Sequence, residues 1–261
     1  MTITNDEYHA DSAVSASHLK AILQSPYHYW ARFVDPDRKP IEPTAAMRLG
    51  SLAHCAILEP DELLQRYGVC GARNTKAGKE QAAAMEAEGI EPVTSADMAL
   101  ALSMAAAVRS HPAAAALLKQ GKAEQSFWWD DLPTGLRCKC RPDWYHGSTV
   151  VDIKTTTDAS PQAFARAVAS FAYHVQAAHY LAGLHGAERF VFVAVEKTYP
   201  HAVAVYELDA ASMALGRTTR DNAMDVLAGC RVADAWPGYG DTLQTISLPS
   251  WATNPIQTET F

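Results

Sequence analysis

The sequence predicts an α/β fold in which helices flank a central mixed β-sheet, with a mainly helical N-terminal region. Two observations predict it. Of the 261 residues, 48% are hydrophobic and 20% are charged, a balance typical of a chain that folds around a core. Helical patterns fill residues 1–120, whereas strand and helix patterns alternate over 121–235. We expect one domain spanning 1–261, whose last residues, 236–261, form a C-terminal tail.

Capping residues and prolines mark the expected helices of the N-terminal region. Ser15 or Ser17 caps a first helix, which restarts at Pro26. Thr44 begins the next helix, which ends at Pro60. Further helices are expected over residues 74–88, 95–108 and 112–119, and the first of these is polar enough to form a surface helix or arch.

The strand patterns begin near Glu124. Apolar and basic residues alternate over 136–141 after the aromatic run 127–129, which predicts a β-hairpin with a loop of about four residues. A third strand is expected over 149–154, followed by a long helix over 160–184. The order is completed by strands over 190–196 and 202–208 and a helix over 209–229.

Charge and hydropathy exclude several classes of protein. With 22 Lys and Arg against 29 Asp and Glu, the net charge of −7 argues against a general nucleic-acid coat but leaves room for a local basic channel around an acidic metal site. The longest apolar runs fall far short of the roughly 18 residues that a membrane span requires. The N-terminus lacks the order of a secretion signal. We expect a cytoplasmic protein that does not associate with membranes.

Two carboxylates and a lysine are expected to converge in the strand region. Asp143 ends the second hairpin strand, and nine residues later Asp152 and Lys154 lie on one face of the third strand. Neighbouring carboxylates repel unless a cation lies between them, and Mg²⁺ suits such oxygen ligands. Lys154 would hold, or help to deprotonate, a water that attacks phosphorus. The alternative is an ordinary solvated strand face.

These residues resemble the signature of the PD-(D/E)XK nucleases, with Asp143 after Pro142, then Asp152, Ile153 and Lys154. The resemblance implies a restriction-endonuclease-like core that hydrolyses phosphodiester bonds in DNA. It implies a Mg²⁺ cofactor for which Mn²⁺ substitutes, and Ile153 is counted with Asp143 and Asp152 in the metal site.

A second motif lies on the following helix. Tyr173, Gln176 and Tyr180 are three and four residues apart and therefore share one helix face. Gln176 and Tyr180 resemble the QxxxY element of the RecB-like branch of these nucleases. The resemblance implies that they orient active-site groups or, with Tyr173, bind the DNA backbone. The alternative is a half-buried amphipathic helix.

Two further metal-site residues are expected from the resemblance. Residues 48–54 resemble the helix of this branch whose histidine faces the metal, so His54 is a candidate ligand or orienter; a lone histidine on an apolar helix is otherwise structural. Glu124 corresponds to a glutamate that joins the metal site of lambda-type exonucleases, although it can equally be a strand-edge carboxylate. A glutamate within 80–88 is the other candidate to complete the metal site. The expected residues are compatible with one metal ion or with two.

Arg137, Lys139 and Arg141 alternate along the hairpin and are candidates to line a DNA channel; a solvated strand face is the alternative.

Over nearly the whole chain, including residues 247–251, the sequence resembles RecE-type exonuclease domains. This resemblance implies an exonuclease that degrades linear double-stranded DNA from its ends, 5′ to 3′, and leaves single strands for phage-type recombination. It also implies a ring or toroid of identical chains and a single-strand annealing protein as partner. A catalytically silent DNA-binding or assembly module and an endonuclease are the competing functions.

Overall fold

The computed structural model describes residues 4–40 and 42–249. Ser250 and Trp251, which belong to the C-terminal part of the family resemblance, lie outside the described residues. Within the described ranges, no helix is both long enough and apolar enough to cross a membrane.

A five-stranded mixed sheet forms the centre of the molecule, in the order β3-β6-β7-β8-β9. Its strands are β3 (Lys122–Ala123), β6 (Trp144–His146), β7 (Thr149–Thr156), β8 (Arg189–Glu196) and β9 (Val203–Glu207). The two long strands β7 and β8 run parallel, and the other pairs are antiparallel. The predicted mixed sheet with flanking helices is therefore confirmed.

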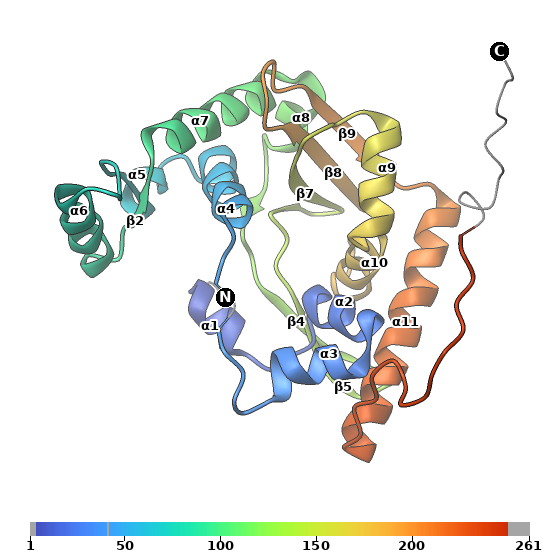
Figure 1. The fold of residues 1–261 in the computed structure, drawn as a ribbon. Coiled ribbons are helices and arrows are strands. Elements are labelled where there is room, and N and C mark those ends of the chain that lie inside the picture. Colours follow the sequence, from blue (N-terminus) through green and yellow to red (C-terminus); the bar gives the residue numbers. More distant parts are fainter. Residues whose placement is uncertain (1–3, 41, 250–261) are drawn as a thin grey trace, which may run out of the picture.

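Helices cover both faces of the two central strands (Figure 1). On one face, Val151 and Ile153 of β7 pack with Leu52 and Met104 from α4 and α7. On the other face, Val150 packs against residues of α9 and α10. The helices are α1 (Asn5–Ala10), α2 (Ala16–Gln24), α3 (Pro26–Tyr29), α4 (Ala45–Leu58), α5 (Leu63–Arg66), α6 (Lys76–Ala87), α7 (Ser95–Ser110), α8 (Pro112–Leu117), α9 (Pro161–Ser170), α10 (Tyr173–Gly183) and α11 (Ala210–Ala233), with a π-helical turn η1 (Trp30–Val34).

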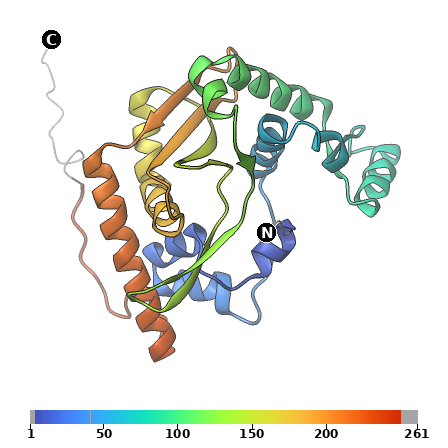
Figure 2. The same cartoon turned by 180° about the vertical axis from the view of Figure 1, so that it is seen from behind.

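The predicted hairpin exists, but it does not belong to the central sheet. Strands β4 (Phe127–Asp131) and β5 (Leu136–Cys140) pair antiparallel around a four-residue loop and form a sheet of their own. This hairpin packs with α2, α3 and α11 in a separate apolar cluster. Both views show it beside those helices, away from β8 and β9 (Figures 1 and 2). Val14 adds a parallel bridge to Cys138, so the N-terminal segment pairs with the edge of the hairpin.

One expectation about local structure is wrong. The single long helix over 160–184 is two helices, because Ala172 between α9 and α10 adopts a left-handed conformation with φ of 50°. The mainly helical N-terminal region also contains β1 (Tyr67–Val69) and β2 (Glu91–Val93), which form a small parallel sheet. By contrast, Ser15 and Thr44 do occupy the predicted N-cap positions of α2 and α4.

Candidate active site

Three elements deliver a cluster of candidate metal ligands beside the central sheet. One ligand atom each from His54 on α4, Glu124 just after β3 and Asp143 just before β6 lie within 4.8 Å of one another. His54 Nδ1 lies 3.4 Å from Asp143 Oδ2, and the same oxygen accepts a 2.6 Å hydrogen bond from the backbone N–H of Ile153. The Ile153 side chain is buried in the core, so this residue reaches the cluster through its backbone.

The electrostatics of this cluster fit a divalent cation. Burial, and then the neighbouring Asp143 and Glu59, raise the pKa of Glu124 to about 8. Burial also raises the pKa of Asp143, against the opposing effect of His54. Two half-buried carboxylates whose ionisation is disfavoured, together with an imidazole, form a donor set whose charge a divalent metal ion would neutralise.

The structure distinguishes the two glutamate candidates. Glu124 lies in the cluster with His54 and Asp143. Its backbone N–H donates to Asp143 O at 3.2 Å, and its φ of 50° places it in the left-handed region rather than in a regular strand. The alternative glutamates within 80–88 belong to α6 and its end, and α6 projects away from the central sheet in both views (Figures 1 and 2).

Asp152 lies next to this ligand cluster and is held by two neighbours of its own. It is 1% exposed, which rules out the alternative of a solvated strand face. Lys154 Nζ pairs with Asp152 Oδ2, and Gln176 Nε2 donates to Asp152 Oδ1 at 2.6 Å. Burial disfavours the charged form of Lys154, but Asp152 and then Asp143 outweigh it, so that the pKa of Lys154 is raised. Lys154 is therefore an ammonium ion.

The helix α10 supports this arrangement. In addition to Gln176, this helix carries Tyr173, whose ring centroid lies 4.7 Å from Lys154 Nζ. Tyr180 is buried, and its hydroxyl donates to the backbone oxygen of Arg141 at 3.2 Å, two residues before Asp143. Gln176 and Tyr180 of the QxxxY element therefore both contact groups of the site, the Asp152 carboxylate and the backbone next to Asp143.

The expected basic channel along the hairpin is wrong for Lys139. This residue is 2% exposed, and its ammonium donates to the backbone oxygens of Tyr8 at 2.5 Å and Asp11 at 2.7 Å. Arg141 is half-buried over the Tyr8 ring and donates to Ser126 Oγ at 2.8 Å, while Arg137 is exposed. Val14 pairs with the edge of β5, whereas Tyr8 and Asp11 of the N-terminal segment cover Lys139 on the face where a channel was expected.

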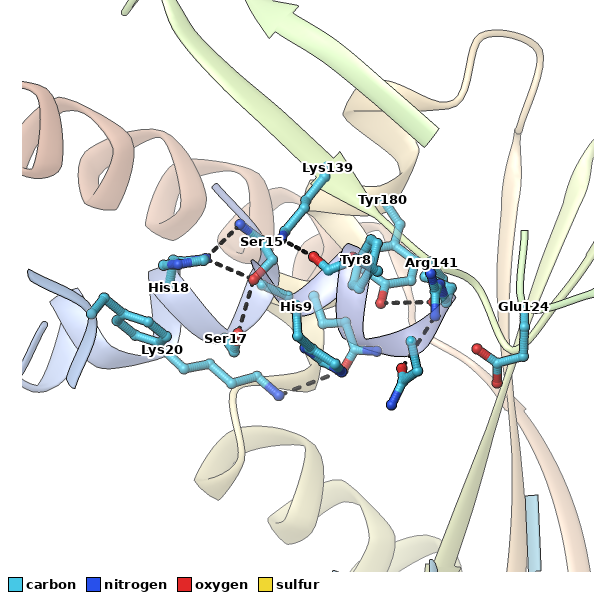
Figure 3. A pocket seen from close by; sticks show the side chains of 14 residues that line it. Tyr8, His9, Ser15, Ser17, His18, Lys20, Glu124, Lys139, Arg141 and Tyr180 are labelled. Atoms are coloured by element: carbon cyan, nitrogen blue, oxygen red, sulfur yellow. Dashed lines mark hydrogen bonds between the residues drawn. The ribbon is translucent and has the colours of Figure 1, made fainter. Parts of the chain in front are cut away.

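Cavities open on two sides of the ligand cluster. One of about 350 Å³ is lined by Ser17, Lys20 and Gln176, together with Glu124 and Arg141 (Figure 3). A second, of about 630 Å³, is lined by residues that include His54, Glu59 and Arg66 and shares Glu124 and Arg141 with the first. Sequence reasoning missed Lys20 in this neighbourhood, because Lys20 lies 156 positions before Gln176 in the chain and no motif links them.

One solved structure shares this architecture. A "Putative exonuclease" of Eubacterium rectale has a crystal structure with a TM-score of 0.67 at 14% identity, covering 98% of this chain and 100% of that one, which is a likeness of fold. SSO0001 matches at a TM-score of 0.31 and 16% identity over 71% of this chain and 88% of its own. No curated protein matches the sequence. The model of the family described as "PDDEXK-like domain of unknown function (DUF3799)" matches residues 15–249, and the chain therefore belongs to this PDDEXK-like family.

Proposed function

We propose that the protein is a metal-dependent deoxyribonuclease that hydrolyses phosphodiester bonds from the ends of linear double-stranded DNA. The observation that carries the proposal is the pairing of two features within one site. One is the cluster of His54, Glu124 and Asp143, and the other is the buried ion pair of Asp152 with Lys154. Carboxylates that hold a divalent ion beside a lysine are a recurring arrangement for attack of water on phosphorus.

The roles of the chain's own residues follow from their surroundings. His54, Glu124 and Asp143 would hold Mg²⁺, or Mn²⁺ in its place, with Asp152 adjacent. The bound ion would supply Lewis-acid activation of water and of the phosphodiester. Lys154 keeps its proton, since the neighbouring carboxylates raise its pKa, so it would donate a hydrogen bond to the attacking water or to the phosphate instead of acting as a base. Gln176 and Lys154 together fix the orientation of the Asp152 carboxylate.

A nuclease assay separates this function from its competitors. Linear and closed circular duplexes would be incubated with the protein, with Mg²⁺ or with EDTA, and compared with Asp143→Asn. We expect Mg²⁺-dependent loss of the linear duplex alone. Cleavage of the circle would instead support an endonuclease. Intact linear DNA at a large excess of protein would support a silent DNA-binding or assembly module. That alternative is disfavoured by the buried ionisable groups of the site, which are costly to keep without a function.

The finer features of the proposal rest on the resemblance to RecE-type exonucleases. They are 5′ to 3′ polarity, single strands produced for phage-type recombination, a ring or toroid of identical chains, a single-strand annealing partner and a cytoplasmic location. Duplexes labelled at either the 5′ or the 3′ end test the polarity, because a 5′ to 3′ enzyme releases the 5′ label first. The mass of the native protein by light scattering tests the ring.

A further inference from the structure

A lysine that belongs to none of the nuclease motifs reaches the active site from the N-terminal region. Lys20 lies on α2, whose neighbouring residues Leu19 and Ile22 are buried against the cluster shared with α11 and the hairpin. Its Nζ lies 3.5 Å from Gln176 Oε1 and 5.0 Å from the centroid of the Tyr173 ring. The Lys154 ammonium lies near the same ring. Lys20 is thus a second cation beside the same helix.

The contacts of Gln176 show what this lysine does. The side-chain amide of Gln176 has a single acceptor, Oε1, and a single donor group, Nε2. The acceptor faces the Lys20 ammonium and the donor faces Asp152 Oδ1. If the amide were flipped, its oxygen would face the carboxylate and its NH₂ group would face the ammonium, so both contacts would become repulsive. A cation on one side and an anion on the other therefore select one orientation.

We propose that Lys20 is a positioning residue of the nuclease site, which acts through Gln176 to hold the Asp152 carboxylate in place. The inference rests on the proposed function. Four groups form a chain of alternating partners: Lys20 donates to Gln176, Gln176 donates to Asp152, and Lys154 pairs with the other oxygen of that carboxylate. Burial, and then Lys154, lower the pKa of Lys20 to about 8, so the residue still carries its charge near neutral pH.

A different role for Lys20 is direct contact with a DNA phosphate, because the residue also lines the cavity shown in Figure 3. The two roles predict different couplings. A residue that acts through Gln176 loses its effect once Gln176 is removed, whereas a residue that contacts DNA by itself keeps its effect. A double-mutant cycle between Lys20 and Gln176 measures this difference.

The cycle uses Lys20→Met, Gln176→Ala and the double variant, assayed for Mg²⁺-dependent cleavage of linear duplex near neutral pH. We expect Lys20→Met to lower kcat by about 10- to 100-fold, as loss of an outer partner of a ligand typically does, with KM unchanged. Lys20→Arg should restore most of the rate, and the double variant should be no slower than Gln176→Ala. Lys119→Met, at an exposed lysine after α8, is the control and should match the wild type.

A readout in the metal-free protein does not depend on activity. The side-chain amide signals of Gln176, identified by NMR as those absent from Gln176→Ala, should exchange slowly with water in the wild type and faster in Lys20→Met. If the rate losses of Lys20→Met and Gln176→Ala multiply in the double variant, the positioning role is overturned in favour of a DNA contact. A raised KM in Lys20→Met would overturn it in the same way. Unchanged amide signals would overturn it as well. A wild type that cleaves no DNA would refute the proposed function, and the amide signals would still decide whether Lys20 orients Gln176.

Discussion

Replacing Lys154 with Ala is expected to destabilise the protein as well as to abolish cleavage. Lys154 pairs with a carboxylate that is almost wholly buried. Apart from that ion pair, Asp152 Oδ2 has no hydrogen-bond partner among the described residues, and Gln176 serves the other oxygen. Removing one partner of a buried ion pair typically costs about 3–5 kcal/mol. At about 2–4 °C per kcal/mol for a chain of this size, the melting temperature should fall by roughly 6–20 °C.

The double variant Asp152→Asn with Lys154→Met separates stability from catalysis. Because a neutral pair leaves no buried charge unpaired, its free energy of unfolding should return toward the wild-type value, while cleavage stays absent because the ammonium is missing. Thermal denaturation followed by circular dichroism in EDTA, and cleavage of linear duplex in Mg²⁺, measure the two properties. A melting temperature of Lys154→Ala within about 2 °C of the wild type would refute the reasoning, because it would correspond to less than about 1 kcal/mol.

Three further expectations concern the ligand cluster, the helix packing and the N-terminal segment. Since burial and Asp143 raise the pKa of Glu124 to about 8, its protonated form stabilises the metal-free fold at low pH, and this contribution is lost as the pH rises through that value. Mg²⁺ should then raise the melting temperature more at about pH 9 than at about pH 6, and Glu124→Gln should reduce the difference. Gly216→Ala places a methyl group against the backbone oxygen of His174, where α11 meets α10. The free energy of unfolding measured by urea denaturation should fall by about 1–3 kcal/mol, and an unchanged urea midpoint would contradict that packing. Arg141→Ala removes contacts to Ser126, Asn5 and Tyr8, so amide hydrogen exchange should quicken over residues 4–11 and stay unchanged in α7.

The sequence predicted the features that depend on local physics. Ser15 and Thr44 cap helices through contacts within one turn, and the alternation around Ile153 correctly separates Asp152 from the apolar face of β7. Features that depend on distant partners were not predictable in this way. The alternating Arg and Lys of β5 indicate an open face, but Tyr8 and Asp11, which cover Lys139, lie more than a hundred residues earlier in the chain.

Short or irregular segments were missed for a related reason. Strand β6 has three residues and gains its pairing from β7, so its own sequence carries little strand signal. The break at Ala172 has no glycine or proline to mark it, although the left-handed conformation there sets the start of the helix that carries Gln176. Lys20 joins the site by packing of α2 against α10, which no local pattern encodes.

The nine-residue spacing between Asp143 and Asp152 has a structural explanation in the β6–β7 hairpin. Trp144 pairs with Val151, so the position opposite Asp152 is that of Asp143, and Gly147 with φ of 56° lies in the two-residue turn between His146 and Thr149. This register brings the Asp143 carboxylate to the backbone N–H of Ile153. A slip of one residue in β7 would exchange the face that carries Asp152 with the face that carries Val151 and Ile153. The spacing therefore specifies the acidic pair through strand length and turn type, which links the motif in the sequence to the geometry of the site.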